Sequence, residues 1–242
     1  MDFEAFYDSY WRQQGDTFDQ RRQSLLVRYV QPGDRVLQVD CGPGVLAARL
    51  TELGAQVVGT DLSNEALRRA RSRGITAFQV NLDRDPLPFG DASFDVVVSD
   101  SQIEHRVDSD RYLDECVRVL RPGGRLVLCV PNTAHWRVRW WLLQGRFPIL
   151  PNTPTDWLHL RFFTLPDMRR LLDQRGVSIE AVDGSASLWV PDLYPSWLQR
   201  GRPAQLYEEL THRRPSFFGR DLILLGRKQP TTPNTKHLTP GT

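Results

Sequence analysis

Apolar residues recur along the chain in two rhythms, one typical of buried strands and one typical of amphipathic helices. Short, nearly continuous apolar runs predict five strands, at 35–39, 56–60, 75–80, 94–100 and 125–130. Apolar residues at helical spacing predict three helices between them, at 44–54, 63–74 and 108–124. Strands and helices therefore alternate through the first half of the chain.

Turn-forming residues mark the ends of these helices. Ser63 is a favourable N-cap for the second helix, and Gly54 and Gly74 are favourable stops for the first and second. Pro122 and the glycine pair that follows it are expected to close the third helix. These signals support the predicted boundaries independently of the apolar pattern.

The flanking segments follow a looser pattern. We expect one or two helices within residues 1–30 and irregular insertions at 132–163 and 185–216. The remaining predicted elements are a helix at 165–176, a strand at 177–184 and a final strand at 220–228.

The alternation predicts an α/β fold. Because crossovers between parallel strands are right-handed, we expect a Rossmann-like, doubly wound, mostly parallel sheet with helices on both faces. The last strand is expected to be antiparallel, and the insertion at 132–163 to form an aromatic-rich cap. The predicted organisation is a helical segment at 1–30, an α/β domain at 31–228 and a disordered, Pro/Thr-rich tail at 229–242.

Composition narrows the functional classes. The chain has 242 residues, of which 40% are hydrophobic, and a net charge of +2, which argues against a broad nucleic-acid-binding face. Three cysteines, Cys41, Cys116 and Cys129, lie in apolar segments, as is typical of reduced thiols in a cytoplasmic protein. The N-terminus shows no apolar signal core, and no apolar run approaches the roughly 18 residues of a membrane span.

A glycine turn follows the first predicted strand. Gly42 and Gly44 leave the backbone bare, and the next helix begins with free N–H donors, so a ligand can lie against this turn. Asp61 ends the second strand, where a carboxylate can accept both hydrogen bonds of a ribose diol. Alternatively, Asp61 serves only the helix N-terminus beside Ser63.

Four stretches, in this order, resemble the class I S-adenosylmethionine-dependent methyltransferases: "VLQVDCGPG", "VVGTDLS", "NLDRDPLPFGDASFDVVVSDSQIEH" and "VRVLRPGGRLVLCVPN". They cover residues 34–132. The later "HLRFFTLPDMRRLLDQRGV" is similar to the family's penultimate helix and strand. "PNTAHWRVRWWLLQGRFP" followed by "HLRFFTLPDM" most resembles the MetW-like branch of the family.

The resemblance implies S-adenosylmethionine as the cofactor. Gly42 and Gly44 would wrap its methionine part, and Asp61, with Leu62 beside it, would hold the ribose hydroxyls. The other implied contacts are Asn81, Leu82 or Asp83 at the adenine, Ser99 and Asp100 facing the transferring methyl group, and Tyr10 and Trp11 of segment 1–30 closing over the cofactor.

Two positions depart from the family pattern. Gln38 stands in place of an acid, and Asp40 stands in place of the first glycine. Gln38 keeps an acceptor oxygen but loses a charge, at an expected cost of about 1.5–3 kcal/mol in cofactor binding. Asp40 adds bulk at the turn, and its carboxylate either obstructs the cofactor or reaches its cationic groups.

Two histidines are candidate general bases for methyl transfer. His105 follows Glu104 just after the fourth strand, and His159 lies in the insertion ahead of Arg161. The alternatives are that His105 only packs or caps the next segment and that His159 only anchors the next helix. We expect no metal site, because no histidine, cysteine and carboxylate cluster has metal-ligand spacing in the sequence.

The insertion is expected to select a small-molecule acceptor. Six of the seven tryptophans lie beyond the fifth strand, which is expected to place aromatic rings over the acceptor side. "HWRVRWWLLQGRFPIL" either forms a lid helix or, as a basic amphipathic stretch, contacts anionic membranes; we favour the lid.

Two functions therefore remain open. The first is an S-adenosylmethionine-dependent methyltransferase acting on a small molecule, without nucleic acid or membrane partners. The second, motivated by Gln38 and Asp40, is a weakly catalytic or non-catalytic partner protein. The resemblance makes that role plausible, because MetW-like proteins are implicated in methionine biosynthesis alongside an acyltransferase. The sequence leaves open both a protein partner and a homodimer.

Overall fold

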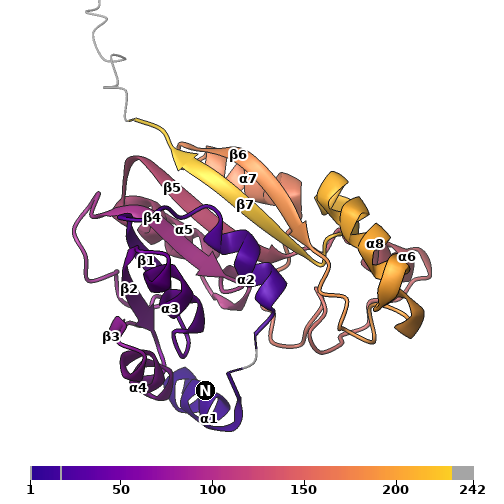
Figure 1. Cartoon of the computed structure of the whole chain (residues 1–242), viewed down its shortest axis with the longest axis horizontal. Helices are drawn as coiled ribbons and strands as arrows, with labels where there is room; N and C mark the ends of the chain where they lie inside the picture. Colours follow the sequence, from indigo (N-terminus) through magenta and orange to yellow (C-terminus); the bar gives the residue numbers. More distant parts are fainter. Residues whose placement is uncertain (1, 17, 231–242) are drawn as a thin grey trace, which may run out of the picture.

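The computed structural model describes residues 2–16 and 18–230 and contains a seven-stranded sheet with the order β3-β2-β1-β4-β5-β7-β6 (Figure 1). The strands are β1 Arg35–Val39, β2 Gln56–Asp61, β3 Thr76–Gln79, β4 Phe94–Asp100, β5 Leu120–Pro131, β6 Val177–Ser185 and β7 Asp221–Lys228. β1 to β5 run parallel, and β7 is antiparallel to both β5 and β6. The predicted fold class is confirmed. Most of the tail predicted at 229–242 lies outside the described residues.

Helices cover both faces of the sheet (Figure 1). The α-helices are α1 Phe3–Gln13, α2 Gln20–Val27, α3 Val45–Glu52, α4 Asn64–Ser72, α5 Ser109–Val119, α6 Trp136–Leu143, α7 Leu165–Asp173, α8 Gly201–Arg213 and α9 Pro215–Phe218. α2 and α3 share one apolar cluster with β1, β4, β5 and β7, whereas α5 and α7 share a second cluster with the same strands. α4 packs against β2 and β3.

The capping signals act as predicted. The Ser63 side chain accepts a hydrogen bond from the Ala66 amide and begins α4. Gly54 and Gly74 have φ angles of 98° and 80° just after α3 and α4 end, a region that glycine enters without steric cost. Local chemistry therefore sets where these helices begin and end.

The third predicted helix is shorter than expected. α5 ends at Val119, and Leu120 already pairs with Phe94 of β4, so β5 includes the Pro-Gly-Gly segment that we assigned to the helix. Proline disfavours the helical conformation in the residue before it, here Arg121, so the helix cannot reach the glycine pair. The register shift between Phe94 and Val96 absorbs this irregular start of β5.

The two insertions are more ordered than predicted. The segment 132–163 contains α6, and the segment 185–216 contains α8, the start of α9 and a 3₁₀ turn at Ser196–Leu198. Together they form a cap with its own small core, which includes Trp141 from α6 and Tyr207 from α8. Pro203 lies within the first turn of α8, where a proline is tolerated, so it does not interrupt this helix.

Most of the cap tryptophans do not cover the acceptor side. Trp140, Trp157 and Trp197 are each at least half exposed, and only Trp189 of the cap tryptophans contributes to the main cavity described below. α6 packs Trp141 into the cap and contributes no residue to that cavity, so the lid expected of this helix stays a prediction. Among the described residues, no helix combines the length and the apolar character needed to cross a bilayer.

Candidate functional site

A cavity of about 360 Å³ lies where the carboxyl ends of β1, β2 and β4 meet. This is the point at which the strand order reverses, where open α/β sheets bind ligands. α1 and α2 line one side of the cavity, and the cap loop 152–159 lines another. Its charged lining groups include Arg22, Asp40, Asp61, Asp83, Asp100, Glu104, Arg106 and Arg220.

The two glycines of the turn have different tasks. Gly42 lines the cavity with a φ of 54°, and a Cβ there would lie 3.0 Å from the Trp11 ring. Gly44, with a φ of 77°, begins α3, and a Cβ there would lie 2.9 Å from the Ala70 Cβ of α4. Gly42 therefore keeps the cavity wall bare, whereas Gly44 permits close packing of α3 against α4.

Asp61 links the second strand to the glycine turn. Its carboxylate accepts hydrogen bonds from the Gly42 amide at 2.8 Å and from the Ser63 amide at 2.9 Å. Burial, followed by the charge of Asp40, raises its pKa to about 7. Asp61 therefore serves the start of α4, and it also lines the cavity beside Leu62, where a ligand can reach it.

Asp40 lines the same cavity as Gly42 and is paired with an arginine. Its backbone is left-handed, with a φ of 51°, which explains why the resembled family carries glycine here. The buried carboxylate forms an ion pair with Arg106, and Arg106 lies 3.6 Å from Asp83. Burial raises the Asp40 pKa and Arg106 opposes the rise. We infer that Arg106 holds the carboxylate where it does not obstruct Gly42.

Gln38 has an unsatisfied oxygen. The residue is 3% exposed, and its Oε1 has no hydrogen-bond partner among the described residues. Leaving a buried acceptor unpaired costs about 1–3 kcal/mol. Because Gln38 lines the cavity, this oxygen is available to a ligand that can donate a hydrogen bond.

The segment after β3 supplies one lining residue. Asp83 lines the cavity, and its carboxylate accepts a hydrogen bond from the Val107 amide. Leu82 is buried in the core, and the Asn81 side chain accepts a hydrogen bond from the Asp83 amide. Of the three candidates for adenine contact, only Asp83 therefore contributes to the cavity wall.

Ser99 and Asp100 end β4 but face different groups. Ser99 is fully buried and shares a hydrogen bond of 2.8 Å with the Tyr112 hydroxyl, outside the cavity wall. Asp100 lines the cavity and forms an ion pair of 3.0 Å with Arg22 of α2. The sequence analysis missed Arg22, although a charged residue beside the apolar positions of a predicted helix was a usable signal.

The N-terminal helix α1 lies over the cavity and beside α4 (Figure 1). Tyr10 and Trp11 line the cavity, and so does Tyr7, which was not predicted from the sequence. Asp8 accepts hydrogen bonds from the Ser63 hydroxyl and the Glu65 amide, so α1 is attached at the N-terminus of α4. None of the α1 residues is fully buried, so polar surface contacts and aromatic packing hold this lid.

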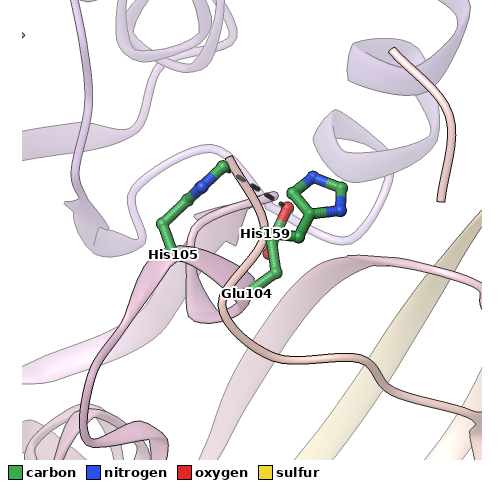
Figure 2. Close-up of side chains that lie close together, drawn as sticks. All are labelled: Glu104, His105 and His159. Atoms are coloured by element: carbon green, nitrogen blue, oxygen red, sulfur yellow. Dashed lines mark ion pairs between the residues drawn. The ribbon is translucent and has the colours of Figure 1, made fainter. Parts of the chain in front are cut away.

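Glu104, His105 and His159 lie close together at the cap side of the cavity (Figure 2). Glu104 is 1% exposed, and burial raises its pKa to about 8. Burial, followed by the charge of His159, lowers the His105 pKa to about 4, and burial lowers the His159 pKa as well. The fold therefore brings the two predicted histidines together, along with a carboxyl group that the sequence did not single out.

The strand order, the glycine turn and the acid at the end of β2 place the chain among the class I S-adenosylmethionine-dependent methyltransferases. The model of one family, described as "Methionine biosynthesis protein MetW", matches residues 21–200, and the chain belongs to this family.

Individual relatives agree with this assignment. A demethylmenaquinone methyltransferase of Clavibacter sepedonicus is 39% identical over 75% of this chain and 71% of that protein. A ubiquinone biosynthesis O-methyltransferase of Idiomarina loihiensis is 29% identical over 63% of this chain and 65% of that protein. A solved S-adenosylmethionine-dependent methyltransferase of Mesorhizobium loti is 26% identical, with a TM-score of 0.60 over 85% of this chain and 97% of that one. The chain spans only 48% to 65% of the length of the curated relatives ranked first in similarity, including the Idiomarina loihiensis protein.

The stability of the unliganded protein should fall as pH rises from about 6.5 to 8. Glu104 has a pKa near 8 in the folded protein against 4.5 in the unfolded chain, so between these values the folded protein holds a proton that the unfolded chain has released. The unfolding free energy therefore falls as pH rises toward 8. One such group changes the unfolding free energy by about 1.4 kcal/mol per pH unit. Urea unfolding at pH 6.5 and 8 should show a fall of about 2 kcal/mol for the wild type and a smaller one for Glu104→Gln. The exposed Glu52→Gln is the control, and a slope shared by all three proteins would contradict the assignment.

Asp40→Asn should destabilise the protein by about 3 kcal/mol, because it removes the nearer and more buried of the two charged partners of Arg106. Asp83→Asn is the matched control: Asp83 is more exposed and more distant from Arg106, so its loss should cost less than about 1 kcal/mol. Thermal and urea unfolding of both variants measure the difference. Equal effects would show that Arg106 does not depend on Asp40.

Proposed function

We propose that the protein is an S-adenosylmethionine-dependent methyltransferase that acts on a small-molecule acceptor. The proposal rests on one observation. The backbone amide of Gly42 donates a hydrogen bond to Asp61 at the point where the strand order reverses, and both residues line a cavity of about 360 Å³. This volume lies within the range of small-molecule sites, roughly 300–1,000 Å³.

The residues present fit the cofactor. Asp61 would hold the ribose hydroxyls with the lone pairs that its two backbone hydrogen bonds leave free. Gln38 would accept a hydrogen bond from the cofactor's ammonium group with its unpaired oxygen. Tyr10 and Trp11 would cover the bound cofactor, and Leu62 and Asp83 would line its adenosine side.

The cofactor would supply an electrophilic methyl group on its sulfonium. The protein's own contribution is to exclude water and to align the acceptor. His105 and His159 line the cap side of the cavity and each keeps a ring nitrogen free, so either would be available to the proposed acceptor. A relative named for O-methyl transfer in ubiquinone biosynthesis supports an oxygen acceptor.

A second candidate is a partner protein of the same fold with little catalysis, for which the substitutions Gln38 and Asp40 remain the motive. The family description, which names methionine biosynthesis, is compatible with this role. The ion pair between Asp40 and Arg106 weakens the case, because it removes the expected obstruction of the turn. We favour the enzyme, with the cytoplasm as its proposed location.

Asp61→Asn should weaken S-adenosylmethionine binding about ten- to hundred-fold, because a charge-assisted hydrogen bond to the ribose becomes a neutral one. Isothermal titration calorimetry of the full chain measures the affinity. Asp173→Asn, at the exposed end of α7, is the control and should bind as the wild type does. Failure of the wild type to bind at millimolar cofactor would favour the partner role, and an unchanged affinity in Asp61→Asn would show that the cofactor lies elsewhere.

Gln38→Glu should tighten S-adenosylmethionine binding by about tenfold or more, because it provides a charge for the cofactor's ammonium group. The same change should lower the stability of the unliganded protein, because another carboxylate would be buried near Asp40 and Asp61. Titration calorimetry and urea unfolding measure these opposite effects. A Gln38→Leu control should weaken binding, and tighter binding in that variant would show that the Gln38 oxygen has no polar role.

A further inference from the structure

Three potential metal ligands meet at the cap side of the cavity, although two come from the 3₁₀ turn Ile103–His105 after β4 and one comes from the distant cap. The ligand atoms of Glu104, His105 and His159 all lie within 4.8 Å of one another (Figure 2). His105 Nε2 is 3.9 Å from Glu104 Oε1, and the two imidazole rings are 5.2 Å apart between centroids. These distances exceed hydrogen-bond length, so the side chains surround a common point without bonding to one another.

Glu104 is a carboxyl group with no partner of its own. It is 1% exposed, and neither of its oxygens has a hydrogen-bond partner among the described residues. Buried carboxylates are normally paired with a cation, hydrogen-bonded or bound to a metal. The neighbouring His105 does not fill this role, because its Nε2 lies 3.9 Å from Glu104 Oε1, beyond hydrogen-bond length.

Both histidines are oriented as metal ligands usually are. Nδ1 of His105 lies 3.1 Å from the Leu158 carbonyl oxygen, and Nδ1 of His159 lies 3.2 Å from the Pro154 carbonyl oxygen. A carbonyl can only accept, so each Nδ1 carries the proton and each Nε2 keeps its lone pair. A hydrogen bond of this kind from the second ring nitrogen fixes the orientation of histidine ligands in metal sites.

The backbone also holds the cluster in place. The Glu104 carbonyl accepts hydrogen bonds from the Leu160 amide at 2.8 Å and the Arg161 amide at 3.0 Å. These bonds tie the cap loop that carries His159 to the 3₁₀ turn Ile103–His105. The juxtaposition is therefore built into the fold and does not depend on the side chains alone.

We propose that Glu104, His105 and His159 bind a divalent transition-metal ion. Two neutral imidazoles and one carboxylate suit zinc, iron(II), cobalt(II) or manganese(II) better than calcium or magnesium, which prefer oxygen ligands alone. Metal–ligand bonds of about 2.0–2.2 Å require ligand atoms about 3–4 Å apart, so the cluster needs to contract by only about 1 Å.

The role of this ion rests on the proposed function. The three protein ligands leave coordination positions open toward the cavity, as in catalytic metal sites. An acceptor hydroxyl bound there would lose its proton to water more readily, because a bound divalent cation lowers the pKa of an oxygen ligand. The acceptor oxygen would then form a bond to the methyl carbon as the carbon–sulfur bond breaks, and the sulfonium would become a neutral thioether. The histidines would thus act as ligands, in place of the general-base role expected from the sequence.

The test is metal titration of the full chain after removal of metal with EDTA and dialysis. Calorimetry with zinc should show one ion per chain for the wild type, with affinity at least tenfold weaker in Glu104→Gln, His105→Ala and His159→Ala. His212→Ala is the matched control, because His212 is half exposed and lies beside Asp183, and its affinity should equal that of the wild type. Equal zinc affinity in the wild type and Glu104→Gln, or loss only in His212→Ala, would overturn the proposal.

Two further measurements keep the result interpretable. Glu104→Gln preserves shape and removes a buried carboxyl group, so it should fold even if the alanine variants do not. Cobalt(II) added to the wild type should give visible absorption bands of nitrogen coordination, and Glu104→Gln should need at least tenfold more cobalt(II) to reach the same intensity; identical cobalt titrations would refute the site.

The cofactor proposal is measured separately, by titrating S-adenosylmethionine into EDTA-treated protein. Metal binding without cofactor binding would remove the proposed enzyme and leave the metal site. Cofactor binding in a protein that takes up no zinc would remove the metal site and leave the enzyme.

Discussion

A buried carboxylate needs a cation or several hydrogen-bond donors, and this requirement governs how the carboxyl edge of the sheet is built. Each strand that ends at the cavity satisfies this requirement in a different way. Asp40 after β1 has Arg106, Asp61 of β2 has two backbone amides, and Asp100 of β4 has Arg22. These partners come from the segment after β4, the glycine turn and α2, so the charges fasten the elements that surround the cavity. Glu104 is the exception, since its partner is not among the described protein groups.

The two covers of the cavity differ in how they are held. The cap has an apolar core of its own, formed by α6, α8 and the segment between β6 and α8. α1 has no fully buried residue and is attached to α4 through polar contacts such as those of Asp8. Each surface contact of this kind contributes little to the unfolding free energy, so we expect α1 to detach at a smaller free-energy cost than the cap. The ring of Trp11 lies close to Gly42, so α1 covers the glycine turn.

Local signals predicted the strands and helices of the sheet well, because each of them depends on nearby residues. Ser63 and Gly74 act through hydrogen bonds and backbone angles within a few positions, and the apolar runs report burial directly. The site was less predictable. Whether Asp40 obstructs the turn depends on Arg106, 66 positions later, and the cluster of Glu104 with His159 depends on how the cap folds back. No spacing rule in the sequence encodes such long-range contacts, so this cluster was not predicted.

Glu104 shows how the stability of the unliganded fold and the proposed metal binding oppose each other. In the unliganded protein the carboxyl group is favoured only when it is protonated, and the two histidines only when they are neutral. A neutral carboxyl group beside two neutral imidazoles carries no charge, so the site is tolerated in a buried position without a counter-ion. A divalent cation would remove the proton from Glu104 and use the lone pairs that the histidines keep free. The arrangement that lowers the stability of the unliganded fold at high pH is therefore the same one that favours cation binding. It lies on the cavity wall that the proposed acceptor would contact.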